Sequence, residues 1–267
     1  MNCFVCGEQL KFFCRIGNQE IYRCPNCGLG VTQNLVSQQG DYHRDETYSA
    51  ELELFTNIFL KRVKIISQFK KTGMVLEIGA STGVMLELLK KQGFQVTGVE
   101  MSRVAAKIAE EKGLKIIIDK FENIKFKDSF DIIILNHTLE HLENPQEIIE
   151  KCFLILNKGG IIYIDVPNFG SWSAKQQKCS WPLLLPEEHL WHFTSQALTI
   201  LLHKNKFQVI FKEQASGIFD LVDPLQELIF AITHLKKRFF TELITIVPSF
   251  VISKLQIGTD LMIIAKK

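Results

Sequence analysis

The sequence predicts an α/β fold, a doubly wound and mostly parallel sheet with a small cysteine-rich module in front of it. Short apolar runs alternate with stretches of helical periodicity over residues 73–267, a pattern typical of a parallel sheet covered by helices on both faces. One apolar run, Val75–Ile78, leads into a glycine turn and then into a helix. Two Cys-x-x-Cys pairs near the N-terminus predict the additional module.

The length of 267 residues suits one sizeable domain with an appendage, and 46% hydrophobic residues are ample for a core. A net charge of +2 produces no strong field, which argues against nucleic acid or acidic lipid as a partner. Met1 is not followed by the apolar stretch of a secretory signal. The longest uncharged run near the C-terminus, Leu243–Ser253, is too short to span a bilayer. We therefore expect a cytoplasmic protein.

The N-terminal cysteines have the spacing of a zinc ribbon, expected over residues 1–32. Each pair fits a tight turn that can bring two sulfurs to one tetrahedral ion, and a glycine directly follows each pair. A segment this short lacks a core of its own, so structural zinc would supply the missing stability. Disulfides or a redox site fit less well, because nothing indicates an oxidising compartment and no βαβ pattern surrounds the pairs. The expected zinc ligands are Cys3, Cys6, Cys24 and Cys27.

The glycine turn after the first strand of the main domain is open to several chemistries. A dinucleotide fold has a second glycine where this chain has Ser81, and its last glycine comes one residue later than Gly83. The G-x-S-x-G elbow of a hydrolase matches residues 79–83 literally, but that elbow normally follows several strands of the sheet. In either case the helix N-terminus turns backbone N–H groups toward a ligand, and Glu77 can meet a positive charge or an amine.

The third interpretation fits best. Glu77-x-Gly79-x-x-x-Gly83, followed by Glu100 at the end of the next strand, resembles motif I of the class I S-adenosylmethionine-dependent methyltransferases, with Ser81 in place of the middle glycine. The resemblance implies a Rossmann-like, seven-stranded sheet whose last two strands form an antiparallel pair at its edge.

The resemblance also implies the order of the segments. Residues 33–72 are expected to form a polar linker and a helix, with apolar residues at helical spacing over 52–69. Residues 73–267 are expected to form the methyltransferase domain. Residues 217–258 form an insertion between the last two strands, expected as two packed helices, with a peripheral membrane contact or a dimer contact as alternatives.

The family binds S-adenosyl-L-methionine through residues that follow successive strands. An acid at the position of Glu100 accepts both ribose hydroxyls, although dinucleotide folds share this feature. Asp119 would face the adenine amino group and Phe121 the adenine ring, while Asp119 could equally be a turn residue. Asn136 would lie near the sulfonium. The expected cofactor residues are Glu77, Gly79, Ser81, Gly83, Glu100, Asp119, Phe121 and Asn136.

Residues 137–141 spell H-x-x-E-H, a string found in some zinc proteases. That chemistry requires a helix, whereas this string follows a predicted strand and Pro145 comes soon after. Residues 139–145 instead resemble the ubiquinone-type branch of the methyltransferases, in which Glu140 and His141 would hold a loop. His137 would lie near the reactive end of the cofactor.

Residues 186–194 resemble the E-H-x-x-x-F-[ST] signature of zinc-ribbon-bearing methyltransferases, including sugar C-methyltransferases. The resemblance implies that a Glu-His pair handles the substrate proton, a role that suits histidine. The alternative is that the histidines brace the loop and cap the helix that follows. The expected catalytic residues are His189, Glu188, His192 and His137.

We therefore expect methyl transfer from S-adenosylmethionine to oxygen or carbon of a small-molecule or sugar-type acceptor. A ribosomal RNA base methyltransferase would also combine a zinc ribbon with this fold, but the near-neutral charge argues against it. Two further alternatives are a non-catalytic cofactor-binding or zinc-ribbon interaction protein and a dehydrogenase that binds NAD.

Overall fold

The structure, a computed structural model, describes residues 1–33, 52–215 and 251–267. The linker before residue 52 and most of the expected insertion at 217–258, with its expected membrane or dimer contact, lie outside the described residues. Within the described segments, no helix is both long and apolar enough to cross a membrane.

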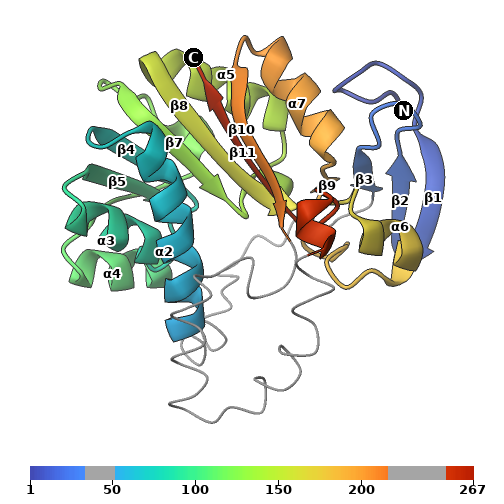
Figure 1. The fold of residues 1–267 in the computed structure, drawn as a ribbon, viewed down its shortest axis with the longest axis horizontal. Coiled ribbons are helices and arrows are strands. Elements are labelled where there is room, and N and C mark those ends of the chain that lie inside the picture. The colour runs from blue at the N-terminus through green and yellow to red at the C-terminus, as the bar shows by residue number, and fades with distance from the viewer. Residues whose placement is uncertain (34–51, 216–250) are drawn as a thin grey trace.

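A seven-stranded sheet forms the centre of the molecule (Figure 1). Its strands are β4 (Met74–Ile78), β5 (Gln95–Glu100), β6 (Lys115–Ile118), β7 (Phe130–Asn136), β8 (Leu156–Pro167), β10 (Gln208–Ala215) and β11 (Asp260–Lys266). The order is β10-β11-β8-β7-β4-β5-β6, and only β11 runs antiparallel to both of its neighbours. The expected mostly parallel sheet with an antiparallel pair at one edge is confirmed. The winding direction reverses between β4 and β7, and ligands of such sheets bind beyond the carboxyl ends of the strands at this point.

Helices cover both faces of the sheet. They are α2 (Leu52–Phe69), α3 (Val84–Lys91), α4 (Arg103–Glu111), α5 (Pro145–Ile155), α6 (Trp172–Gln177) and α7 (Ser195–Lys204), with single turns η1 (Phe121–Asn123), η2 (Leu139–His141) and η3 (Lys178–Ser180). Ile132 and Ile134 of β7 pack in one cluster with α2 and α3. Ile133 and Leu135 pack in the other with α5 and α7. This alternation follows from the two-residue period of a strand.

The helices begin in two different ways. Ser102 and Thr194 cap α4 and α7, because each side chain accepts a hydrogen bond from a first-turn N–H. Helix α3 starts instead at Gly83, which has φ +76° and makes no side-chain cap. The first N–H groups of α3 are therefore left for another acceptor.

One predicted boundary is wrong. Residues 157–160 include two glycines and predict the end of a helix, but α5 already ends at Ile155 and β8 begins at Leu156. The pairing of Leu156 with Phe130 explains this, because β8 continues past an irregularity in its register with β7. Gly159, with φ +75°, provides the conformation that such an irregularity needs.

The N-terminal module is a second, four-stranded sheet at one end of the molecule (Figure 1). Its strands are β1 (Lys11–Ile16), β2 (Gln19–Arg23), β3 (Gly30–Gln33) and β9 (Trp191–His192). Strand β9 comes from the main domain and pairs antiparallel with β3. The rings of Phe4 and Trp191 pack edge to face with centroids 4.8 Å apart. Thr194 Oγ donates a 2.6 Å hydrogen bond to the carbonyl of Cys27. The module is therefore joined to the segment that leads into α7.

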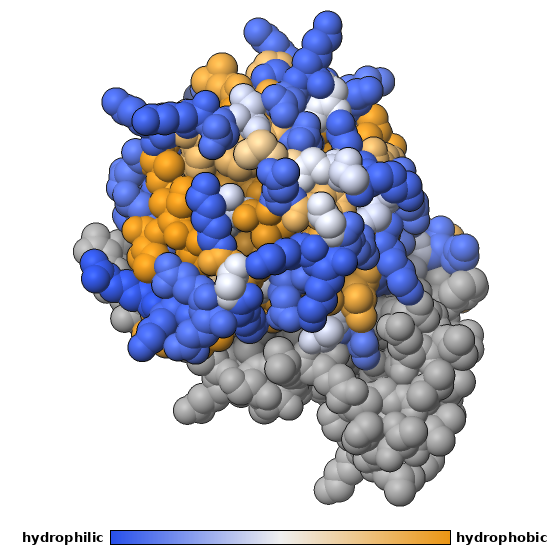
Figure 2. Space-filling view, turned by 90° about the vertical axis from the view of Figure 1, so that its left-hand side faces the viewer, coloured by the Kyte–Doolittle hydropathy of each residue, from blue (hydrophilic) through white to orange (hydrophobic). Residues whose placement is uncertain are grey.

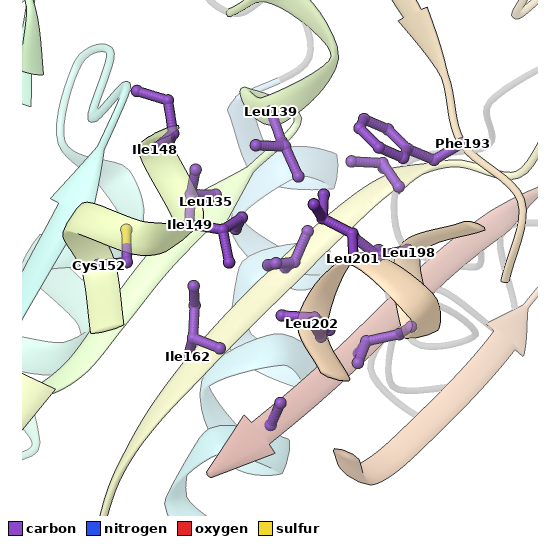
Figure 3. Close-up of a cluster of buried hydrophobic side chains, with 14 of the residues drawn as sticks. Leu135, Leu139, Ile148, Ile149, Cys152, Ile162, Phe193, Leu198, Leu201 and Leu202 are labelled. Carbon is purple, nitrogen blue, oxygen red and sulfur yellow. The ribbon is translucent and has the colours of Figure 1, made fainter. Parts of the chain in front are cut away.

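Phe193 tests whether this junction stabilises the fold. Its side chain is fully buried between the module and α7, beside Leu198 and Leu201 (Figure 3). We expect Phe193→Ala to lower the free energy of unfolding by about 3–5 kcal/mol, because it removes contacts from both sides. Leu154→Ala is the control, since that side chain is 76% exposed and should cost almost nothing. Urea unfolding measures both, and equal midpoints for the two variants would contradict the prediction.

Candidate active site

The turn between β4 and α3 lies at the carboxyl end of the sheet. Gly79, Ser81 and Gly83 all have positive φ, at +74°, +48° and +76°. A Cβ at Gly79 would lie 2.6 Å from Thr138 Oγ1, and one at Gly83 would lie 2.3 Å from Leu114 Cδ1. The two glycines are therefore required by both backbone conformation and space. They let the turn pass close over the neighbouring elements.

Glu100 is fixed by the same turn. Its Oε2 accepts a 2.8 Å hydrogen bond from the Ser81 N–H, and its Oε1 accepts one of 2.8 Å from the Ser102 N–H. Positive φ is unfavourable for serine, which explains why a glycine is usual at this position. The bond to Glu100 offsets that cost. The carboxylate keeps further lone pairs for a ligand's hydroxyl groups.

Two buried oxygens at neighbouring strand ends make no hydrogen bond within the described part of the chain. They are Oε2 of Glu77 on β4 and Oδ1 of Asn136 on β7. Burial, together with the nearby charge of Glu100, raises the pKa of Glu77 well above its usual value, and Arg62 only partly opposes this. Buried polar atoms normally have partners. Both oxygens are therefore suited to accept hydrogen bonds from a ligand, and Glu77 would ionise beside a cation.

A network of buried charges lies next to these oxygens. Arg62 Nε on α2 forms a 2.6 Å ion pair with Asp165 Oδ2 on β8. Tyr163 donates a 3.1 Å hydrogen bond to the same oxygen. Arg62 Nη2 also lies 3.6 Å from Asp260 Oδ2 at the start of β11. Burial and the charge of Asp165 raise the pKa of Asp260 to about 7.

His137 projects from the end of β7 over this network, with φ +48° and with its N–H bonded to the Asp165 carbonyl. Burial alone would lower the pKa of its ring. The contact with Glu140 and the charges of Asp165 and Asp260 outweigh burial and raise the pKa to about 9. Arg62 Nη2, 3.3 Å from the ring, opposes the positive charge, but three carboxylates surround it. The nearby carboxylates thus favour the protonated form of His137.

The expected Glu-His pair occupies the loop before β9. His189 is buried, and burial lowers its pKa to about 4. Its ring lies 4.7 Å from that of His141, centroid to centroid. The backbone carbonyl of Glu188 lies 3.0 Å from His141 Nδ1 and can accept a hydrogen bond from it. The structure therefore brings His189 and Glu188 close to the predicted loop residues Glu140 and His141.

His192 takes a different position from His189. Its Nε2 lies 2.8 Å from Thr32 Oγ1 on β3 of the N-terminal module. Burial lowers its pKa to about 3. This contact matches the bracing alternative, whereas the cap of α7 comes from Thr194.

Asp119 and Phe121 lie beyond β6. Asp119 Oδ1 accepts hydrogen bonds from the Lys120 N–H at 2.7 Å and from Asn123 Nδ2 at 2.9 Å, as a turn residue does. Phe121 is buried, and Lys151 Nζ lies 4.6 Å from the centre of its ring. Both side chains therefore have structural contacts of their own.

Several residues of the site were missed by sequence reasoning. Met101 and Ile118 are exposed beside Glu100, at the ends of β5 and β6, and Figure 2 shows apolar surface on this side of the molecule. An apolar residue directly after a strand-ending acid is a signal that could have identified Met101. The buried network is formed by Arg62, Tyr163, Asp165 and Asp260. Its signals were an acid inside the apolar run of β8 and an arginine inside an otherwise apolar helix face.

The four predicted zinc ligands do come together. Cys3 Sγ and Cys27 Sγ are 3.6 Å apart, Cys6 Sγ and Cys24 Sγ are 3.3 Å apart, and all four sulfurs lie within 4.8 Å of one another. Sulfurs around a tetrahedral zinc ion would be separated by about 3.8 Å, given a Zn–S bond of about 2.3 Å. The four thiols are free, and their separations lie on either side of this distance, between 3.3 Å and at most 4.8 Å.

Sequence comparison places the chain among methyltransferases. A family model for a methyltransferase domain matches residues 43–211. An uncharacterized methyltransferase of Alkaliphilus oremlandii is 30% identical over 153 residues, covering 54% of this chain and 70% of the relative. A ubiquinone biosynthesis O-methyltransferase of Histophilus somni is 31% identical over 113 residues, covering 37% of this chain and 48% of the relative. The chain thus spans only about half of the length of some curated relatives that it matches.

Solved structures show the same fold. A SAM-dependent methyltransferase from Archaeoglobus fulgidus has a TM-score of 0.56 at 22% identity, covering 83% of this chain and 99% of that one. The plantazolicin methyltransferase BamL, solved with a triazolic desmethylPZN analog and SAH, has a TM-score of 0.55 at 19% identity, covering 84% of this chain and 88% of that one. Since the family model covers more than half of its length, this chain belongs to the methyltransferase-domain family of S-adenosylmethionine-dependent enzymes.

Proposed function

We propose that this chain binds S-adenosylmethionine at the carboxyl ends of β4, β5 and β7 and methylates a small-molecule or sugar-type acceptor at oxygen or carbon. The observation that carries the proposal is the pair of acids Glu77 and Glu100 on either side of a glycine turn whose helix has no side-chain cap. The unpartnered oxygen of Glu77 supports this fit, since it suits the ligand's ammonium group.

Each part of the site has a matching part of the cofactor. Glu100, held by two backbone N–H groups, would accept the ribose hydroxyls. The exposed Met101 and Ile118 would cover the apolar adenine. Asn136 would lie near the sulfonium, and Asp119 and Phe121, which follow β6, would lie near the adenine. The bound cofactor supplies an activated methyl group, and the chain's residues orient it toward the acceptor.

The acceptor would lie beside the end of β7. His137 is a cation there and suits an acceptor that carries or develops negative charge. His189 and Glu188 are the proposed proton-handling pair. His192 would keep their loop attached to the N-terminal module through Thr32.

We also propose that the four N-terminal cysteines hold a structural zinc ion. Their sulfur separations support this, and so do Gly7 and Gly28, whose φ values of +80° and +76° close the two Cys-x-x-Cys turns. The ion would stabilise β3, and β3 pairs with β9 and so holds the loop before it. Residues 186–194 resemble a signature of the sugar C-methyltransferases, and this resemblance supports a sugar-type acceptor.

Cofactor binding is expected to depend on pH through the ionisation of Glu77. Glu77 has a raised pKa in the free protein, and an ammonium group bound beside it would stabilise its ionised form. Binding should therefore release protons, and affinity should rise with pH until Glu77 is ionised in the free protein. Isothermal titration in two buffers of different ionisation enthalpy measures this release.

The matched variants make this experiment specific. Glu77→Gln should bind at least about tenfold more weakly and lose the buffer dependence, because it cannot ionise. Glu110→Gln, an exposed acid on α4, should behave as the wild type. A buffer-independent enthalpy for the wild type, or binding of NAD in place of S-adenosylmethionine, would overturn the proposed cofactor site.

Zinc removal should affect the loop that carries His189. Cys24→Ser should lower the zinc content by one ion per chain and increase hydrogen exchange at residues 189–194, because β3 no longer supports β9. Cys179→Ser, outside the cluster, should change neither. Elemental analysis and hydrogen-exchange mass spectrometry measure these effects. Unchanged exchange in zinc-depleted Cys24→Ser would contradict the proposed link.

A further inference from the structure

We propose that Glu140, His141 and His189 form a second divalent-cation site, distinct from the cysteine cluster and next to the acceptor. The proposed ion is a transition metal such as zinc, manganese or cobalt, which suits two imidazoles and a carboxylate. The ion's role in methyl transfer rests on the proposed function above, whereas its binding rests only on the geometry of the three side chains.

The three donors come from two segments that are held together. One ligand atom from each side chain lies within 4.8 Å of the other two. The backbone N–H of Leu190 donates a 3.0 Å hydrogen bond to the carbonyl of Glu140, so the loop before β9 is fixed to η2. An ion bound at about 2.1 Å separates tetrahedral donors by about 3.4 Å. Small side-chain rotations would therefore close the group around an ion.

Glu140 provides an independent reason to expect a ligand. Its side chain is only 1% exposed, and neither carboxylate oxygen makes a hydrogen bond within the described residues. Nδ1 of His137 lies 3.5 Å from Oε1 and forms an ion pair with it, so Oε2 is the oxygen that is left for a further ligand. Buried carboxylate oxygens normally have a partner or coordinate a metal. A cation between Glu140 and the two histidines would satisfy Oε2.

The two histidines have the surroundings of metal ligands. His141 Nδ1 lies 3.0 Å from the Glu188 carbonyl, the type of acceptor to which a metal-bound histidine usually donates its second N–H. His189 is buried, and its ring centroid lies 4.7 Å from that of His141. Both imidazoles therefore lie where a single ion could contact them.

This site explains the H-x-x-E-H string without a protease. Glu140 and His141 lie in the single turn η2 rather than on an α-helix, so the histidines at 137 and 141 do not form the usual zinc pair. His189, from a distant loop, completes the group instead. Three protein ligands leave coordination positions open, as in catalytic metal sites.

The open positions define a class of acceptor. A hydroxyl group bound to the ion would have a lowered pKa and would lose its proton to water. The resulting oxygen anion would form the new O–CH3 bond while the S–CH3 bond breaks and its electron pair remains on sulfur, which gives a neutral thioether. The site thus favours O-methylation of a hydroxylated acceptor over C-methylation.

Metal binding can be tested on the full chain with zinc in the cysteine cluster. Co2+ is titrated into this protein and followed by visible absorption and by isothermal titration. We expect one further equivalent to bind without a thiolate-to-cobalt band. Glu140→Gln, His141→Ala and His189→Ala should each weaken this binding by at least about tenfold, as expected for lost ligands. His203→Ala, an exposed histidine in the last turn of α7, is the control.

The outcomes separate this inference from the proposed function. S-adenosylmethionine should bind the folded His141→Ala variant, whose replaced ring is exposed, as tightly as it binds the wild type. Failure of the zinc-loaded wild type to bind one equivalent of Co2+, or wild-type Co2+ affinity in all three variants, would overturn the metal site alone. Failure of the wild type to bind S-adenosylmethionine while Co2+ still binds would overturn the proposed function and leave the metal site standing.

Discussion

The buried ion pair between Arg62 and Asp165 is the interaction on which the rest of the site depends. Replacing either partner would leave an uncompensated charge inside the protein, which is strongly destabilising. The pair joins α2 to β8, and the Asp165 carbonyl then holds the His137 N–H at the end of β7. His137 in turn faces Glu140. One charge pair beneath the sheet end therefore sets the positions of groups on four different elements.

A second dependence runs from the cysteine cluster to the same place. Strand β3 pairs with β9, Thr32 contacts His192, and the Leu190 N–H is bonded to the Glu140 carbonyl. Backbone hydrogen bonds and one histidine thus connect the N-terminal module to the loop that contains His189 and to Glu140. Under the proposed function, the module would support the acceptor side of the site.

The sequence predicted what depends on neighbouring residues and missed what depends on distant ones. The turn at Gly79–Gly83 was predicted because positive φ and close packing leave a local signature. The clustering of the four N-terminal cysteines was predicted because the Cys-x-x-Cys spacing is also a local signature. The pairing of Arg62 with Asp165 was missed, because nothing local connects a helix to a strand about a hundred residues later. The extension of β8 to Leu156 was missed because it requires a partner in β7.

The four-stranded sheet also constrains how the chain is made. Thr32 and His192 are 160 residues apart in sequence, so β3 emerges from the ribosome long before β9 exists to cover it. Until then β3 is an edge strand with unpaired backbone groups, which is the type of surface that joins other chains. An ion captured early by the cysteines would keep this edge in a compact hairpin during synthesis. A long period with one exposed strand edge is therefore the consequence of pairing an N-terminal strand with a segment near residue 190.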